Sequence, residues 1–141
     1  MINQIFPCLW FDGQAKAAAD FYCSIFPNSK VISENPMVTI WDLNGRKFMG
    51  LNGGPLFKFN EAVSFVISCD TQEEIDHYWN KLTADGGAES MCGWLKDKFG
   101  VSWQVIPSNL GEIMSEPARA GKAMKVIMTM KKLDLEKIMN A

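Results

Sequence analysis

The stretch CGWLKDKFGVSWQV, residues 92–105, predicts two strands joined by a turn. The strands span about Cys92 to Lys96 and Val101 to Ile106, and the turn-prone Asp97-Lys98-Phe99-Gly100 separates them. The second strand alternates, with Val101, Trp103 and Val105 on one face and Ser102, Gln104 and Ile106 on the other. If the larger apolar set packs under a helix, Gln104 faces the opposite side of the sheet.

A strand and a helix precede this pair. Two sets of side chains alternate along residues 63–69: Val63, Phe65, Ile67 and Cys69 in one, and Ser64, Val66 and Ser68 in the other. This period of two predicts a half-buried strand. Asp70-Thr71 followed by Glu73 and Glu74 is a capping-box pattern that opens a helix. The apolar stripe of that helix is Ile75, Tyr78, Trp79 and Leu82, and Gly86-Gly87 ends it.

The first half of the chain shows the same order of elements. Ile5 to Phe11 is an apolar run of strand length, and a helical pattern runs from Gln14 to the break at Pro27. Two further strands, Met37 to Leu43 and Lys47 to Leu51, flank Asn44-Gly45, a strong hairpin signal. Asn52-Gly53-Gly54-Pro55 then predicts a tight turn rather than a phosphate loop, because no helix follows it.

The two halves superimpose at an offset of 57 residues, which places Phe21-Tyr22 over Tyr78-Trp79. A strand–helix–hairpin unit cannot bury both faces of its sheet alone, so pairing of two units is expected. We therefore predict one α+β domain over residues 1–141, in which two similar halves enclose an apolar cup. The first module covers about 5–55, the second about 61–107, and a helical tail about 110–141.

The tail from Glu116 departs from this repeat. Its apolar stripes predict one or two short helices: Ala120, Met124, Ile127 and Met128, then Leu135, Ile138 and Met139. Such a stripe is hidden equally well by a helix that lies on its own domain and by a dimer contact. Both alternatives stay open at the level of sequence.

Composition excludes several classes of partner. With 14 basic and 16 acidic residues the net charge is -2, so nucleic acid is not expected to bind. No apolar run approaches the ~20 residues that span a bilayer, and the first residues lack a signal-peptide pattern, so we expect a cytoplasmic protein without membrane contact. The four cysteines form no C-x-x-C and are expected to be reduced thiols.

Five segments carry a resemblance to a known family: residues 7–15, Phe21-Tyr22, residues 25–28, residues 51–55 and, most specifically, residues 92–105. They resemble the PhnB-like (demethylubiquinone methyltransferase-like) family of the glyoxalase, bleomycin-resistance and extradiol-dioxygenase superfamily, also called vicinal oxygen chelate. The resemblance implies two tandem βαβββ modules whose sheets curl around a cavity, frequently with elements exchanged in a homodimer.

The resemblance also implies where a metal would lie, since His, Glu or Gln ligands project from the first and last strands of each module. Gln104 matches the last ligand position, while its first-half counterpart is Met49, whose thioether is a poor ligand for a hard ion. The first strands hold no histidine, and Cys8 is their one donor of note. We therefore predict no cofactor and no metal; Gln104 and Cys8 would be the ligands if one bound.

The predicted ligand-binding residues are Trp10, Met49, Ser64, Trp94, Ser102 and Gln104. His77 is expected at a partly solvated helix position rather than in catalysis. Asp97 and Glu61 are the nearest carboxylates, and both are expected to be solvated at strand ends or turns.

Three functions fit these features. The first is a metal-independent protein that holds an apolar or aromatic small molecule in the cup, at or near a homodimer interface. The second is an enzyme, either an unconventional metal-dependent lyase or dioxygenase, or a methyltransferase, which is the weaker variant because no strand–glycine-loop–helix is present. In the third, the Met-rich tail docks another protein.

Overall fold

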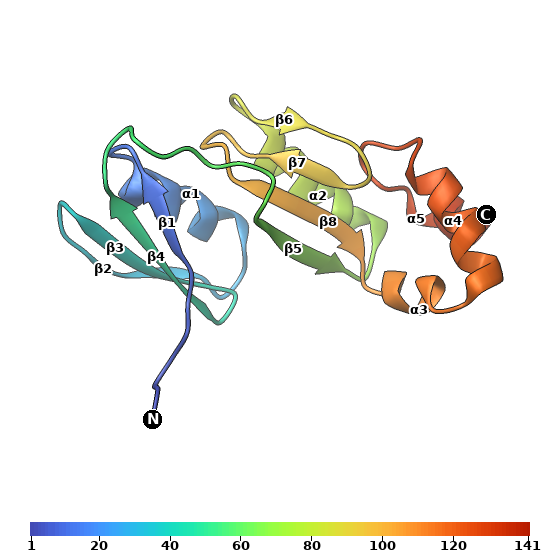
Figure 1. Cartoon of the computed structure of the whole chain (residues 1–141), viewed down its shortest axis with the longest axis horizontal. Helices are drawn as coiled ribbons and strands as arrows, with labels where there is room; N and C mark the ends of the chain where they lie inside the picture. The colour runs from blue at the N-terminus through green and yellow to red at the C-terminus, as the bar shows by residue number, and fades with distance from the viewer. The chain divides into compact units, whose positions relative to one another are not determined.

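In a computed structural model that describes residues 1–141, the chain divides into two compact units, Met1–Phe59 and Asn60–Ala141 (Figure 1). Each unit is built on a four-stranded sheet, with the strand order β1-β4-β3-β2 in the first and β5-β8-β7-β6 in the second. Neither sheet closes into a barrel. The predicted α+β class, with two βαβββ modules and C-terminal helices, is confirmed.

The first unit contains β1 (Cys8–Phe11), α1 (Ala15–Ile25), β2 (Lys30–Glu34), β3 (Val38–Leu43) and β4 (Arg46–Asn52). Strand β1 runs parallel to β4, and the other pairs are antiparallel. The first strand was predicted from Ile5, but it begins at Cys8, and the Ile5 side chain is exposed. The βαβββ order implied a strand after α1, but the residue pattern did not locate β2, because its residues are mostly exposed and show no alternation.

Helix α1 covers one face of this sheet with aromatic packing. Tyr22 and Trp41 are almost fully buried, and Trp41 stacks on Phe48 with ring centroids 5.7 Å apart. Asn44 and Gly45 both have positive φ, so the predicted Asn-Gly hairpin turn is confirmed.

The predicted turn at residues 52–55 also has a specific role in this unit. The Asn52 side chain accepts a hydrogen bond from the backbone N–H of Ala15 at 2.9 Å and donates one to the carbonyl of Pro36 at 3.0 Å. Helix α1 has no side-chain cap of its own, so Asn52 satisfies one of its free N–H groups from across the sheet. Gly53 lies against the indole of Trp10, where a larger residue has no space.

The second unit contains β5 (Ser64–Cys69), α2 (Gln72–Thr83), β6 (Ala88–Glu89), β7 (Trp94–Lys96), β8 (Ser102–Pro107), α3 (Leu110–Met114), α4 (Pro117–Ile127) and α5 (Leu135–Met139). Strands β5 and β8 are parallel, as β1 and β4 are in the first unit. The predicted capping box is confirmed, with Thr71 as N-cap and Glu74 as its partner. The βαβββ order implied a strand after α2, but the residue pattern did not locate β6, because it has only two residues and both are exposed.

The turn between β7 and β8 is organised by Asp97, which is 2% exposed. One carboxylate oxygen accepts hydrogen bonds from the backbone N–H groups of Phe99 at 2.8 Å and Val101 at 3.1 Å. The other accepts one from the indole N–H of Trp103 at 2.9 Å. The expectation that Asp97 is solvated was wrong, because these three donors satisfy the carboxylate inside the hairpin.

The C-terminal helices lie on their own unit. Their core consists of Ile113, Ala123, Ile127, Leu133 and Ile138. The segment after α4 accepts hydrogen bonds from Cys92 and Gly93, and Gln72 of α2 bonds to the backbone of Leu133 and Leu135. Ile127, predicted in the apolar stripe, is buried, but Met124 and Met128 are exposed, and Ala123 is the inward residue beside Met124. No helix is long and apolar enough to span a bilayer.

Candidate functional site

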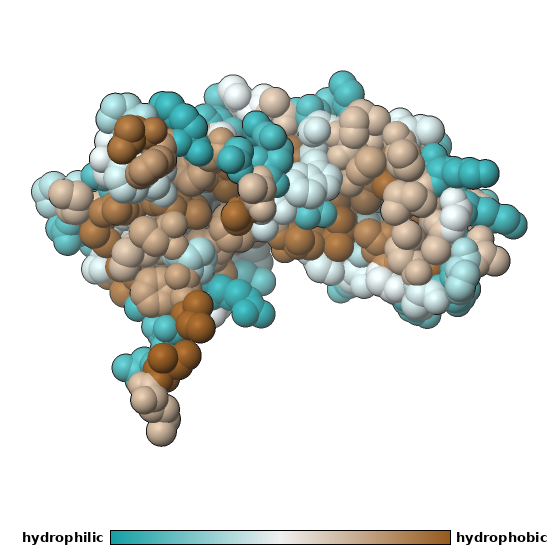
Figure 2. Space-filling view, viewed as in Figure 1, coloured by the Kyte–Doolittle hydropathy of each residue, from teal (hydrophilic) through white to brown (hydrophobic).

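Each sheet has one face covered by a helix, and we call the other its open face, although in the second sheet Ile106 at one end of that face packs against the core of the C-terminal helices. In the second unit the covered face carries Leu95, Trp103 and Val105, all buried against α2, which lies behind the sheet in Figure 1. The residues between them in sequence therefore project from the open face. Figure 2, seen from the same side, shows hydrophobic residues beside hydrophilic ones over β5 and β8.

Strand register arranges the open face of the second sheet in rows that cross β5, β8 and β7. The first, which we call the polar row, consists of Ser64, Ser102 and Lys96. The second, the aromatic row, consists of Val66, Gln104 and Trp94. Four of the six predicted ligand-binding residues lie in these two adjoining rows: Ser64, Trp94, Ser102 and Gln104.

Gln104 lies on the face opposite Trp103, as the alternation predicted, and it is the central residue of the aromatic row. Its side-chain N–H donates a hydrogen bond to the Ser64 hydroxyl at 2.9 Å, which leaves the Gln104 amide oxygen as an acceptor on the open face. Val66 is 55% exposed and Trp94 is half-buried, so apolar surface flanks the amide on both sides. The aromatic row can therefore hold a flat apolar group beside one polar contact.

Ser102 is the most unusual residue of the polar row. Its side chain is 1% exposed, yet its hydroxyl has no hydrogen-bond partner. Such a group normally costs about 1–3 kcal/mol relative to a satisfied one. Ser102 thus offers a donor and an acceptor that the chain itself does not use.

Lys96, at the other side of Ser102, forms an ion pair with Glu61. Glu61 precedes β5 and Lys96 lies on β7, so the pair reaches across β8, the strand that carries Ser102. The hydrogen bond from Lys96 and its charge lower the pKa of the Glu61 carboxyl. Both side chains are more than 40% exposed, and an ion pair in that setting contributes little to stability.

The two remaining ligand-binding residues, Trp10 and Met49, lie on the open face of the first sheet. Met49 pairs with Cys8 on β1, and Trp10 pairs with Leu51. The Trp10 indole N–H donates to the carbonyl of Gly54 at 2.8 Å, and its ring packs edge-on against Phe57. The Trp10 indole is therefore held in place and offers only apolar surface to a ligand, because its N–H is already bonded to the backbone.

These residues do not fit a divalent metal. No three His, Cys, Asp or Glu side chains come together as a potential ligand set. Partial desolvation raises the pKa of the Cys8 thiol, although the residue is exposed. Cys8 adjoins Met49, which is a weak ligand for hard ions, and the Gln104 amide oxygen is a single donor atom. His77 is exposed on α2, as expected, and takes no part in either face.

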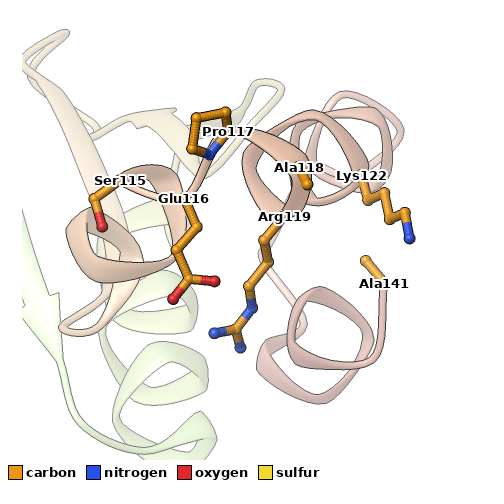
Figure 3. Close-up of a pocket in the computed structure, with 7 residues that line it drawn as sticks. All are labelled: Ser115, Glu116, Pro117, Ala118, Arg119, Lys122 and Ala141. Atoms are coloured by element: carbon orange, nitrogen blue, oxygen red, sulfur yellow. The ribbon is translucent and has the colours of Figure 1, made fainter.

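A separate depression of about 560 Å³ lies among the C-terminal helices (Figure 3). It is lined by Ser115, Glu116, Pro117, Ala118, Arg119, Lys122 and Ala141. All of these except the half-buried Arg119 are exposed, so a ligand there would keep most of its surface in water. We do not assign a function to it.

Lys96 was not among the predicted site residues, and Glu61 is solvated, as expected, but it also pairs with Lys96. Lys96 follows Trp94 by two residues, so the strand period could have placed it on the same face. Its pairing with Glu61 could not be found in this way, because the two residues are distant in sequence and come together only through the parallel pairing of β5 with β8.

Comparison with known proteins agrees with this architecture. The PhnB protein from Bacillus cereus is 33% identical, with a TM-score of 0.67, and the match covers 74% of this chain and 99% of that one. FosX from Listeria monocytogenes, a fosfomycin resistance protein solved with Mn(II) and sulfate, is 16% identical, with a TM-score of 0.62 over 82% and 98% of the two chains. A glyoxalase/bleomycin resistance protein from Albidiferax ferrireducens T118 is 12% identical, with a TM-score of 0.54 over 72% and 95%.

The fold is that of the glyoxalase and bleomycin-resistance proteins. Within that class, the family model described as 3-demethylubiquinone-9 3-methyltransferase matches residues 3–106, and the chain belongs to this PhnB-like family. The match ends before the C-terminal helices. No curated protein matches the sequence.

Proposed function

We propose that this chain is a metal-independent small-molecule-binding protein that holds an apolar or aromatic ligand on the open face of its second sheet. The observation that carries the proposal is the aromatic row, in which Trp94 and Val66 flank the Gln104 amide. Ligand sites typically combine apolar walls with few polar groups that fix orientation, and this face has that composition. Trp10 and Met49, on the open face of the first sheet, supply a similar apolar surface.

Metal independence is part of the proposal and rests on the chemistry of the donors. Gln104 is the one member of the ligand set expected from the superfamily, and the first-module counterpart is Met49. If protein purified without chelator held near-stoichiometric transition metal that was lost on Gln104→Ala, this part of the proposal would be wrong.

Methyl transfer, named in the family's description, has no observation in its favour here. The Gly53-Gly54 turn is the chain's best candidate for a nucleotide loop, but the Trp10 ring fills the space beside Gly53. The N–H of Ala15 at the nearby helix start is already bonded to Asn52. The N–H groups of Gly53 and Gly54 are both bonded to the carbonyl of Phe11, so this turn lacks the free donors that nucleotide loops provide.

We expect a thermal-shift screen of hydrophobic metabolites and antibiotics to identify a ligand. A ligand at a hundred times its dissociation constant stabilises the protein by about 2.7 kcal/mol. Trp94→Ala should abolish the shift, because it removes the aromatic wall of the row. Met128→Ala is the matched control, since Met128 is exposed in the tail, and it should leave the shift unchanged. A hit that shifts the Trp94→Ala protein equally would contradict the assignment of this face.

The proposal includes a cytoplasmic homodimer with the ligand at or near its interface. Its support is the open apolar face of each sheet, which a second copy could cover. Light scattering at micromolar concentration should give a mass near twice the 15.8 kDa of one chain. A monomeric mass would refute the dimer.

A further inference from the structure

The polar row places an unused hydrogen-bonding group beside the aromatic row. Ser102 is in register with both Ser64 and Lys96, and it precedes Gln104 by two residues on the same face. Its hydroxyl is buried and has no partner. A buried polar group without a partner is rare in folded proteins and calls for an explanation.

An ion pair between Lys96 and Glu61 joins the two neighbours of the strand that carries Ser102. Because Lys96 lies on β7 and Glu61 precedes β5, the pair passes over β8 at the row that contains Ser102. Both partners are well exposed, so separating them costs little. A pair in this position can serve as a movable cover over the Ser102 hydroxyl.

We propose that the ligand is an aromatic ring that carries a neutral oxygen acceptor, such as a ketone carbonyl. This oxygen displaces the Lys96–Glu61 pair and accepts a hydrogen bond from the Ser102 hydroxyl. This inference rests on the proposed function, since it names the ligand class of the same face. The ring lies on the aromatic row against Trp94, and its substituent reaches the neighbouring polar row.

Charge decides between a neutral and an anionic acceptor. Lys96 is the only cation of the two rows, and Glu61 already neutralises it. A carboxylate ligand would have to displace Glu61 from Lys96. Its binding would then replace one ion pair with another and add little free energy. A carbonyl oxygen needs no counter-ion and gains the hydrogen bond that Ser102 lacks.

Three naphthalene probes of similar shape test this ligand class: 2-acetylnaphthalene with a ketone, 2-isopropylnaphthalene without an acceptor, and 2-naphthoate with an anion. Dissociation constants are measured by two-dimensional ¹H–¹⁵N NMR titration. We expect the ketone to bind wild-type protein about tenfold more tightly than the hydrocarbon, the effect of one hydrogen bond to an otherwise unsatisfied group. Ser102→Ala should reduce this ratio to about twofold or less and leave hydrocarbon binding unchanged.

Two further variants serve as control and as a test of the cover. Ser68→Ala removes an exposed hydroxyl from the same face of β5 and should leave the tenfold ratio intact. Glu61→Gln frees Lys96 and should tighten 2-naphthoate binding several-fold. The Ser102→Ala protein should melt at or above the wild-type temperature, because it loses an unsatisfied polar group.

The outcomes separate the two proposals. Binding of the hydrocarbon without preference for the ketone, or a ketone preference that survives Ser102→Ala, overturns this inference and leaves the proposed function standing. Failure of all three probes to bind overturns both. No gain for 2-naphthoate in Glu61→Gln overturns the role given to the ion pair.

Discussion

Replacing Asp97 with alanine is expected to lower the free energy of unfolding by about 3–5 kcal/mol, because it removes three hydrogen bonds from a buried carboxylate. The Trp103 indole N–H would remain buried without a partner, which adds to the loss. Urea unfolding followed by circular dichroism measures the change.

Two comparisons make this prediction specific. Asp97→Asn keeps an oxygen for the backbone N–H groups of Phe99 and Val101 but turns an amide N–H toward Trp103, so its loss should be intermediate. The loss should shrink when Asp97→Asn is combined with Trp103→Phe, which removes the opposing donor. Asp12→Ala is the matched control, since Asp12 is exposed, and it should change stability by less than about 0.5 kcal/mol. A loss for Asp97→Ala no larger than that control would refute the role assigned to Asp97.

Gly53→Ala is expected to destabilise the first unit by about 2–3 kcal/mol, because the added carbon would lie 2.5 Å from two indole carbons of Trp10. The ring cannot move aside freely, since its N–H is bonded to Gly54 and it packs on Phe57. The measurement is again urea unfolding.

Gly121→Ala is a control that should change the free energy of unfolding in the opposite direction. Gly121 lies in helix α4 with nothing within 4 Å of the added carbon, so alanine should stabilise by up to about 1 kcal/mol. In a Trp10→Phe background the cost of Gly53→Ala should fall, because the clashing ring carbons are gone. An equal cost in both backgrounds would show that the indole is not the obstacle.

Sequence periodicity was sufficient for the central elements of the fold. The alternation of residues 101–106 correctly placed Trp103 under a helix and Gln104 on the opposite face, since a strand with one buried face allows only one register. The capping box at Thr71 and the hairpin turn at Asn44 were correct because each depends on neighbouring residues alone.

What sequence could not give depended on distant contacts. The short edge strands β2 and β6 are exposed and carry no pattern of their own. Asp97 appeared to be a solvated turn residue, because nothing local shows that Trp103 and two backbone N–H groups converge on it. In the tail, helical spacing alone left the choice between Ala123 and Met124 as inward residues undecided, and packing against Leu133 and Ile138 selected Ala123.

The central claim is that the open face of the second sheet binds the ligand. The most direct test is the two-dimensional NMR titration of ¹⁵N-labelled protein with 2-acetylnaphthalene, followed at the Trp94 indole and the Gln104 side-chain amide. We expect these two signals to shift together along one saturable curve, while the signals of Arg119 and Lys122 beside the C-terminal depression stay in place. Saturable shifts confined to that depression, with Trp94 and Gln104 unmoved, would contradict the claim.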